Sequence, residues 1–144
     1  AIAKRIASMI RLLGNRNYPI VILVDREDRV ETCEELTEQL LKALKVEGIM
    51  DQDLRIGFAD RMIENWIIAD FNLIGKLNEK PQETDGLKGS SIIKKHKGSY
   101  HKVTDGVSYL LSVDKAEVYK NSKSYKSFID KLHGINCNYL EFEK

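Results

Sequence analysis

The feature that most constrains the fold is a continuous apolar run at residues 18–24, Tyr-Pro-Ile-Val-Ile-Leu-Val. The run is rich in β-branched residues, has polar residues on both sides, and lacks the alternation of a half-exposed strand. Such a run is typical of a strand that is buried on both faces of a parallel sheet. A carboxylate-rich segment, residues 25–29, follows it directly.

The segments around this run alternate between helical and extended patterns. Apolar spacing predicts helices over residues 2–13, 32–45 and 61–77, and a second short strand over residues 54–59. This alternation predicts an α/β domain with a mainly parallel sheet flanked by helices. Because the opening helix of such a fold normally follows a strand, we expect residues 1–77 to form an α/β core that lacks its first strand.

The rest of the chain differs in composition. Residues 78–93 are predicted as a loop, most clearly over 78–90, and residues 94–144 as a basic helical part with a final strand. The expected helices cover 102–113, 114–120 and 123–133, and the expected edge strand covers 135–142. A chain of 144 residues suits one domain, so residues 1–144 are interpreted as a single unit.

The charges are distributed unevenly along the chain. The formal net charge is only +1, whereas nucleic-acid-binding domains are usually basic. Between residues 88 and 131, however, ten lysines face four acids, a balance of +6, and the remainder carries −5. An acidic part next to a lysine-rich part is what a metal site beside a phosphate-binding surface would require.

Composition also bears on the cellular setting. No apolar run approaches the roughly 18 residues of a membrane helix, so no membrane association is expected. The two cysteines, Cys33 and Cys137, lack metal-type spacing, and a reduced, cytoplasmic setting is the default. Cys33 lies on an apolar helix stripe and is interpreted as a core residue. No phosphate-binding glycine loop, dinucleotide fingerprint or nucleophile elbow is present.

The carboxylates after the first apolar run are the strongest candidates for a site. Ligands of open α/β sheets bind outside the carboxyl ends of the strands. Asp25 and Glu27 are two residues apart, so an extended segment projects them the same way, and Asp28 adds a third carboxylate. Mg²⁺ prefers such oxygen ligands. The alternative is structural: Asp25 ends the strand as a turn residue and Asp28 caps the next helix.

A second acidic cluster follows the second predicted strand. Asp60 or Glu64 is expected to bring a carboxylate to the sheet edge that holds Asp25. The structural alternative for Asp60 is a helix N-cap. Trp66 is interpreted as a core residue in preference to a substrate-stacking residue. For Asp70, the structural alternative to a role in the site is an acid on the helix surface.

The third cluster is basic and aromatic. Four lysines, two histidines and one tyrosine lie within residues 94–102. Lysines neutralise phosphates and aromatic rings stack on bases, so this cluster predicts a phosphate-facing surface. The alternative is an ordinary solvated lysine run, and the spacing of His96 and His101 is poor for a metal pair.

In this order, the clusters resemble one family. It is the Toprim-related family of small bacterial proteins of unknown function that are encoded beside ABC-type, OLD-like ATPases in phage-defence clusters. The resemblance spans nearly the whole chain. It rests on the strand ending in Asp25-Arg26-Glu27-Asp28, on Glu64-Asn65-Trp66 with Asp70, on Tyr100 and Lys102, and on Ser122-Lys123-Ser124-Tyr125-Lys126-Ser127-Phe128.

The resemblance implies a Toprim-like (Rossmann-like) fold and a nuclease subunit that depends on Mg²⁺ or Mn²⁺ and works with the ATPase in a hetero-oligomer. In Toprim enzymes a first-strand glutamate works with an aspartate pair. The pair corresponds to Asp25 and Glu27, of which the second is a glutamate, and the first-strand glutamate has no match. The implied site residues are the catalytic Asp25, Glu27 and Glu64, the metal ligands Asp25, Glu27 and Asp28, and the nucleic-acid-binding Lys94, Lys95, Lys97 and Lys102.

Two other readings of the sequence remain. The departures from the Toprim pattern favour a catalytically degenerate subunit that binds and regulates the ATPase. A receiver-like signalling domain with Asp25 as phosphoacceptor is a third possibility, although the lysine-rich part and the lack of repeated strand–helix units argue against it.

Overall fold

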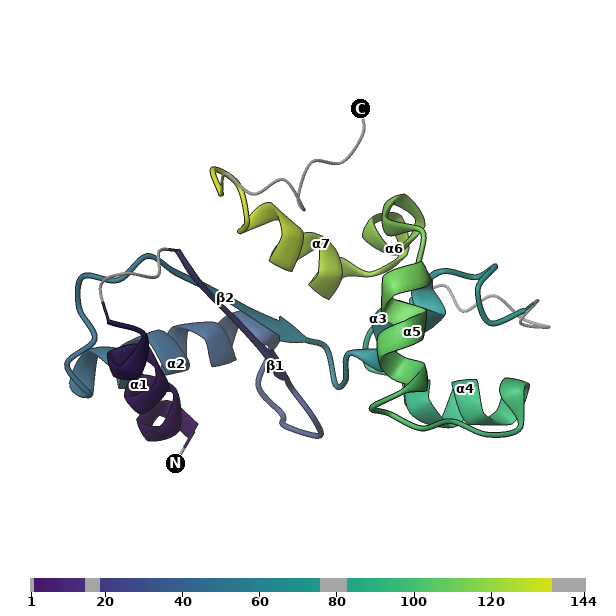
Figure 1. The fold of residues 1–144 in the computed structure, drawn as a ribbon, viewed down its shortest axis with the longest axis horizontal. Helices are drawn as coiled ribbons and strands as arrows, with labels where there is room; N and C mark the ends of the chain where they lie inside the picture. The colour runs from purple at the N-terminus through teal and green to yellow at the C-terminus, as the bar shows by residue number, and fades with distance from the viewer. Residues whose placement is uncertain (1, 15–18, 76–82, 136–144) are drawn as a thin grey trace.

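The computed structural model describes residues 2–14, 19–75 and 83–135, and within them the chain forms seven helices and a two-stranded parallel sheet flanked by helices (Figure 1). In chain order the elements are α1 (Ile2–Leu13), β1 (Ile20–Asp25), α2 (Cys33–Val46), β2 (Leu54–Ala59), α3 (Glu64–Ala69), α4 (Gly89–Lys97), α5 (Asp105–Ser112), α6 (Lys115–Asn121) and α7 (Lys123–Asp130). The prediction of a mixed α/β chain with a parallel sheet is confirmed.

The sheet brings the ends of the two strands together. β1 and β2 run parallel in a register that begins with Ile20 opposite Leu54 and ends with Asp25 opposite Ala59. Both predicted strands are confirmed, the second with the bounds expected from the sequence. Because the strands are parallel, the segments that follow Asp25 and Ala59 leave the sheet at the same edge.

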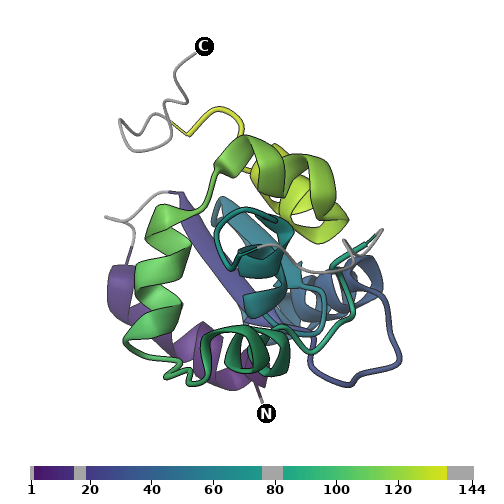
Figure 2. The same cartoon turned by 90° about the vertical axis from the view of Figure 1, so that its right-hand side faces the viewer.

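Helices cover both faces of this sheet (Figures 1 and 2). On one face the apolar stripes of α1 and α2 form a core with alternate residues of the strands, among them Leu40, Ile20 and Ile56. On the other face α7 lies against β2, where the ring of Phe128 covers Gly57. A Cβ atom at Gly57 would lie 2.3 Å from Phe128 Cδ2, so the absent side chain is what allows this close approach.

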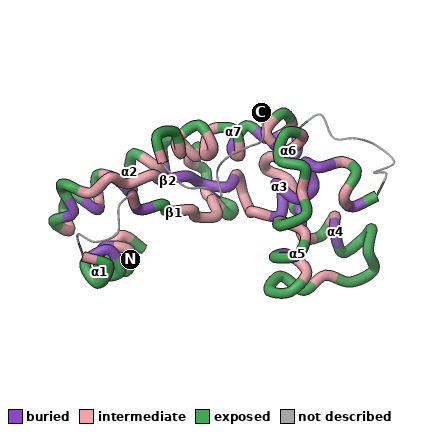
Figure 3. The backbone as a smooth tube through the Cα atoms, turned by 45° about the horizontal axis from the view of Figure 1, so that its top comes forward, coloured by how far each residue is buried: buried purple, intermediate pink, exposed green. Residues whose placement is uncertain are grey.

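The short helix α3 connects the sheet to the basic helical part. All six of its residues are buried, as is the second half of β2, and residues 60–63 of intermediate burial connect these two buried stretches (Figure 3). Trp66 packs with Tyr125 and Phe128 of α7, while Ile67 and Ile68 pack with the side chains of α4 and α5. The position of α3 therefore sets where the C-terminal helices lie.

The helix predicted over residues 61–77 is wrong in its length, because α3 spans only Glu64–Ala69. Asp70 ends it. One carboxylate oxygen of Asp70 accepts a hydrogen bond from the Asn72 amide at 3.1 Å, and the other accepts one from the Asp114 amide at 2.8 Å. Asp70 is thus a buried acceptor that joins two segments, and the reading of it as a surface acid is wrong.

The predicted loop over 78–93 is also wrong at its C-terminal end, since α4 begins at Gly89. The sequence of α4 has two adjacent isoleucines and many polar residues, so its periodicity is weak. Its stability comes from packing on α3: Ile93 is fully buried there, and a Cβ atom at Gly89 would lie 2.6 Å from the Glu64 backbone.

The remaining helices agree with the prediction in place, though not in every boundary. α2 begins with a capping box in which Thr32 accepts from the Glu35 amide and Glu35 accepts from the Thr32 amide. The cap is therefore Thr32, and the reading of Asp28 as the cap is wrong. The final strand predicted over 135–142 lies outside the described residues from 136 onward, as does Cys137. Within the described part, no helix has the length and apolar character needed to cross a membrane.

Candidate functional site

A pocket of about 570 Å³ lies where the two strands end. Its walls come from the end of β1, the loop after β2, the start of α3, the start of α4 and the turn before α5. The lining residues are Asp25, Glu27, Asp28, Arg61, Met62, Glu64, Lys88, Ser90, Tyr100 and Lys102. The location agrees with the rule that open α/β sheets bind ligands at the carboxyl ends of their strands.

Asp25 links the first strand to the start of α3. Its Oδ1 accepts a hydrogen bond from the Ile63 amide at 2.9 Å, and its Oδ2 lies 3.5 Å from Lys102 Nζ. Burial raises the pKa of this carboxyl; Lys102 and the Ile63 amide oppose the rise, and the charge of Glu64 adds to it. The carboxylate is therefore held in a half-buried position where bringing a second positive charge is favourable.

Glu64 is the most unusual residue of the pocket. Its side chain is only 2% exposed. Oε1 accepts a hydrogen bond from the Tyr100 hydroxyl at 3.1 Å and lies 3.7 Å from Lys102 Nζ, whereas Oε2 has no partner among the described residues. A buried carboxylate oxygen without a donor or a cation is costly, and native structures rarely leave one without a reason.

Lys102 lies between these two acids. Its ammonium group is within 3.7 Å of both Asp25 and Glu64, yet 64% of its side chain is exposed. The lysine is thus paired at its charged end while most of its side chain stays exposed. A side chain of this kind can leave the pair of carboxylates with little loss of buried contacts.

The residues present fit a divalent cation at one pair of carboxylates. Within the described residues, no group of three or more histidine, cysteine, aspartate or glutamate side chains is placed to hold a metal ion. Mg²⁺, however, usually keeps several waters and takes only one or two protein carboxylates. Asp25 and Glu64 supply two, and the unpartnered Glu64 Oε2 is an oxygen that a cation would satisfy.

Glu27 lies in a turn with unusual backbone geometry. Its φ is +58° and that of Arg61 is +69°, both in the left-handed region, and the Glu27 amide donates to the Arg61 carbonyl at 2.7 Å. Residues other than glycine that adopt this left-handed backbone conformation each cost about 1–3 kcal/mol of conformational free energy, and they cluster at functional sites. This pairing fixes the loops after both strands against each other at the mouth of the pocket.

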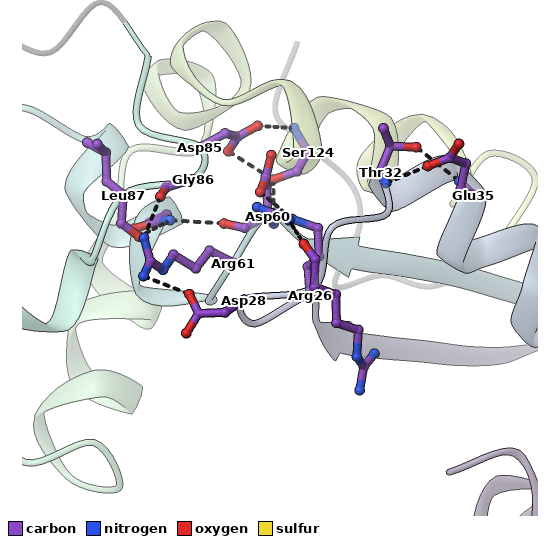
Figure 4. A network of polar contacts seen from close by, with 12 residues as sticks. Arg26, Asp28, Thr32, Glu35, Asp60, Arg61, Asp85, Gly86, Leu87 and Ser124 are labelled. Atoms are coloured by element: carbon purple, nitrogen blue, oxygen red, sulfur yellow. Dashed lines mark hydrogen bonds and ion pairs between the residues drawn. The ribbon is translucent and has the colours of Figure 1, made fainter. Parts of the chain in front are cut away.

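Asp28, which lines the pocket, and Asp60, which does not, are both engaged in ion pairs (Figure 4). Arg61 contacts Asp28 at 2.7 Å through Nη2 and donates to the Gly86 carbonyl through Nη1, while Arg26 Nε contacts Asp60 at 2.7 Å. Asp28, a predicted metal ligand, therefore lines the pocket while paired with a guanidinium group. Asp60 pairs across the two loops and does not cap α3.

The predicted nucleic-acid-binding lysines divide into two groups. Lys102 lines the pocket, whereas Lys94, Lys95 and Lys97 are exposed on the second half of α4. Lys88, which also lines the pocket, was not singled out by the sequence, because it falls in the segment predicted as a loop.

The other residues that the sequence singles out lie in the cores, on the surface or beside the pocket. Trp66 is a core residue, as predicted, and its Nε1 donates to Ser124 Oγ at 2.9 Å. Cys33 packs at the edge of the core that α1 and α2 form with the sheet, and burial raises the pKa of its thiol to about 12. His96 and His101 are exposed. The Tyr100 ring stacks on Tyr109, and its hydroxyl group donates a hydrogen bond to Glu64 in the pocket.

Comparison with known proteins gives no match: no protein-family model fits the chain, and neither the curated proteins nor the solved structures contain a similar one.

Proposed function

We propose that this chain is a Toprim-like, Mg²⁺- or Mn²⁺-dependent nuclease subunit that cleaves phosphodiester bonds together with an ABC-type, OLD-like ATPase in cytoplasmic anti-phage defence. The fold assignment rests on the parallel strands and their flanking helices, and the partner rests on the resemblance of the sequence. The chemistry rests on the pocket.

The observation that carries the proposal is the buried Glu64 carboxylate beside Asp25. Two acids within reach of one ammonium group, one of them with an unpartnered oxygen, form a site with an excess of negative charge. In the protein interior such an excess is relieved most effectively by a cation of higher charge. A pocket at the carboxyl ends of parallel strands gives that cation access to a substrate.

Each residue has a distinct part in this proposal. Asp25 and Glu64 hold the metal ion, Tyr100 orients Glu64 through its hydroxyl group, and Glu27 lies at the mouth as a further acid. A bound divalent cation supplies Lewis-acid polarisation of a phosphoryl oxygen. Lys102, once it leaves the carboxylates, is placed to contact the phosphate and to stabilise charge that develops on it.

The substrate class follows from the surface next to the pocket. α4 starts at the pocket wall and carries Lys94, Lys95 and Lys97 on its exposed second half, with no acid in the helix. Lysines in such an arrangement neutralise backbone phosphates without reading sequence. A nucleic-acid strand is therefore the substrate that uses both the pocket and the helix.

The first test is metal binding to the protein, measured by titration calorimetry with Mn²⁺ and Mg²⁺. We expect Asp25→Asn and Glu64→Gln to weaken binding at least tenfold and Glu27→Gln to weaken it less. Glu38→Gln, an exposed glutamate of α2, is the matched control and should bind as the wild type does. Equal affinity in all four variants would contradict the assignment of the site.

The second test is nuclease activity with the ATPase subunit present. Metal-dependent cleavage should be lost in Asp25→Asn and Glu64→Gln while the circular dichroism spectrum and complex formation stay unchanged. Full cleavage by Asp25→Asn would show that the chemistry takes place elsewhere.

A degenerate, regulatory subunit is the second candidate, and one observation favours it. The Lys102 ammonium occupies the space between Asp25 and Glu64, as a permanent counter-ion of a metal-free site would. If calorimetry detects no metal binding and the protein still forms a complex with the ATPase, this second function replaces the first.

A further inference from the structure

A second set of polar groups lines the same pocket on the α4 side. Lys88, the residue before α4, is exposed, and Ser90, the second residue of the helix, is half-buried. The strongest contact of the Ser90 hydroxyl among the described residues is a weak one, to Met62 Sδ at 3.6 Å. No ion pair engages the Lys88 ammonium within the same part of the chain. Both side chains are thus able to donate to a ligand.

The start of α4 adds to this set. The N-cap residue, Lys88, makes no capping hydrogen bond with its side chain, and the first turn of the helix contains no acid. The Gly89 amide donates to Asn65 Oδ1 at 2.9 Å, which leaves the Ser90 amide without a partner in the described residues. The Ser91 and Ile92 amides donate to the Lys88 carbonyl, so the Ser90 amide and the helix dipole are what favours an anion at this position.

A helix start alone does not make a binding site, but here an independent feature points to a ligand. Glu64 is only 2% exposed and lines the same pocket, and its carboxylate oxygen Oε2 has no partner among the described residues. That feature calls for a cation. A pocket that needs a cation at one wall and can bind an anion at the other is complementary to a metal–phosphate pair.

The charges of the pocket make the two binding events dependent on each other. Four carboxylates and three bases line it, which gives a formal net charge of −1. A phosphate group entering this pocket alone meets net repulsion. A divalent cation changes the local charge to +1, so the anion binds favourably only after or together with the metal.

We propose that the Lys88 ammonium group and the hydroxyl and backbone amide of Ser90 form a phosphate-binding seat that holds a phosphate ester of the substrate beside the metal ion. The inference rests on the proposed function and deepens it, because it names the wall that binds the phosphate and makes phosphate binding dependent on the cation. The seat accepts either a terminal phosphate or an internal phosphodiester, which share the same oxygen chemistry.

The test is a binding titration of the whole chain with inorganic phosphate and with short oligonucleotides that carry a 5′-phosphate or a 5′-hydroxyl group, with and without Mn²⁺. We expect Mn²⁺ to strengthen binding of all phosphate-bearing probes. In the presence of Mn²⁺, Lys88→Ala should weaken oligonucleotide binding about tenfold. The slope of log Kd against the logarithm of the salt concentration should decrease in magnitude by about one. If the oligonucleotide with a 5′-phosphate binds more tightly than the one with a 5′-hydroxyl group, the seat holds a terminal phosphate. If the two bind equally, it holds an internal phosphodiester.

Matched variants separate a specific contact from a general loss of charge. Lys42→Ala removes one exposed lysine from α2 and should change neither the affinity nor the salt dependence. Lys88→Arg should retain most of the binding, and Ser90→Ala should lose part of it because the backbone amide remains. Mn²⁺ affinity should stay within about twofold in Lys88→Ala, since the lysine is not a metal ligand.

The possible failures are distinguishable. If Mn²⁺ binds at Asp25 and Glu64 but Lys88→Ala binds oligonucleotide as the wild type does, the phosphate seat is wrong and the proposed function stands. If Mn²⁺ neither binds nor alters oligonucleotide binding, both proposals are wrong, because the seat is proposed to need the cation.

Discussion

The hydroxyl group of Tyr100 donates a hydrogen bond to Oε1 of Glu64 at 3.1 Å, across 36 residues of sequence. This is the only hydrogen bond to the Glu64 carboxylate that the described residues provide. Tyr100 is itself fixed, because its ring stacks on Tyr109 and its hydroxyl lies against Gly106. Burial raises the pKa of Tyr100 and the charge of Glu64 raises it further, so the hydroxyl stays a donor throughout the physiological range.

Replacing this donor should destabilise the protein. Tyr100→Phe leaves a buried carboxylate with no hydrogen bond, and we expect a loss of about 1–3 kcal/mol in the free energy of unfolding. Urea denaturation measures it. Tyr109→Phe keeps the ring contact and leaves the Glu64 bond in place, so its loss should be smaller. Equal losses in the two variants would mean that the Tyr100–Glu64 bond contributes nothing specific.

The contact between Gly57 and Phe128 predicts a steric effect. Gly57→Ala places a Cβ atom 2.3 Å from Phe128 Cδ2 and should destabilise the protein by about 1–3 kcal/mol. In the Phe128→Ala background the same change should cost much less, because the obstructing ring is gone. Additive effects in this double-mutant cycle would contradict the contact.

The hydrogen bond between Trp66 and Ser124 offers a third measurement. Ser124→Ala removes the acceptor of the buried indole N–H and a donor to Asp85, and should cost about 1–3 kcal/mol. The chain has one tryptophan, so urea unfolding can be followed by its fluorescence. Ser127→Ala, on the same helix, is the control, and it should change stability by less than about 0.5 kcal/mol.

Cys33 should react slowly with thiol reagents. Burial, followed by the charge of Asp60, raises the pKa of its thiol from 9.0 to about 12, so little thiolate exists at pH 8. In a Cys137→Ser background, native protein should react with a disulfide reagent at least about tenfold more slowly than urea-unfolded protein.

The same pKa shift predicts a pH dependence of stability. The folded state holds the thiol proton more tightly than the unfolded state does. Its contribution is therefore complete below pH 9 and is lost as the pH rises from about 9 towards 12. Cys33→Ala should lose this part of the alkaline destabilisation; an unchanged pH profile would argue against the shift.

The local elements of this fold are predictable from the sequence because their signals are local. The apolar run before Asp25 and the stripes of α1 and α2 each lie within about 14 residues, and the parallel sheet follows from their alternation. The expectation that Glu64 shares a sheet edge with Asp25 also agrees with the structure, since both acids lie within 3.7 Å of one ammonium group.

What the sequence does not predict depends on distant partners. α3 ends at Asp70 because the carboxylate accepts from an amide 44 residues away, and α4 is stable through its packing on α3. Lys102 reaches Asp25 across 77 residues. No periodic pattern contains these contacts, so the helix ends and the second wall of the pocket could not be derived from residue spacing.

The hydrogen bond from the Ile63 amide to Asp25 has a consequence for measurement. Most amides at the start of a helix exchange their hydrogens rapidly with solvent, but this one is covered by a carboxylate from a strand 38 residues away. It can exchange only when the end of β1 separates from the start of α3. The exchange rate of this single amide therefore reports how often the pocket opens, before any ligand or partner is known.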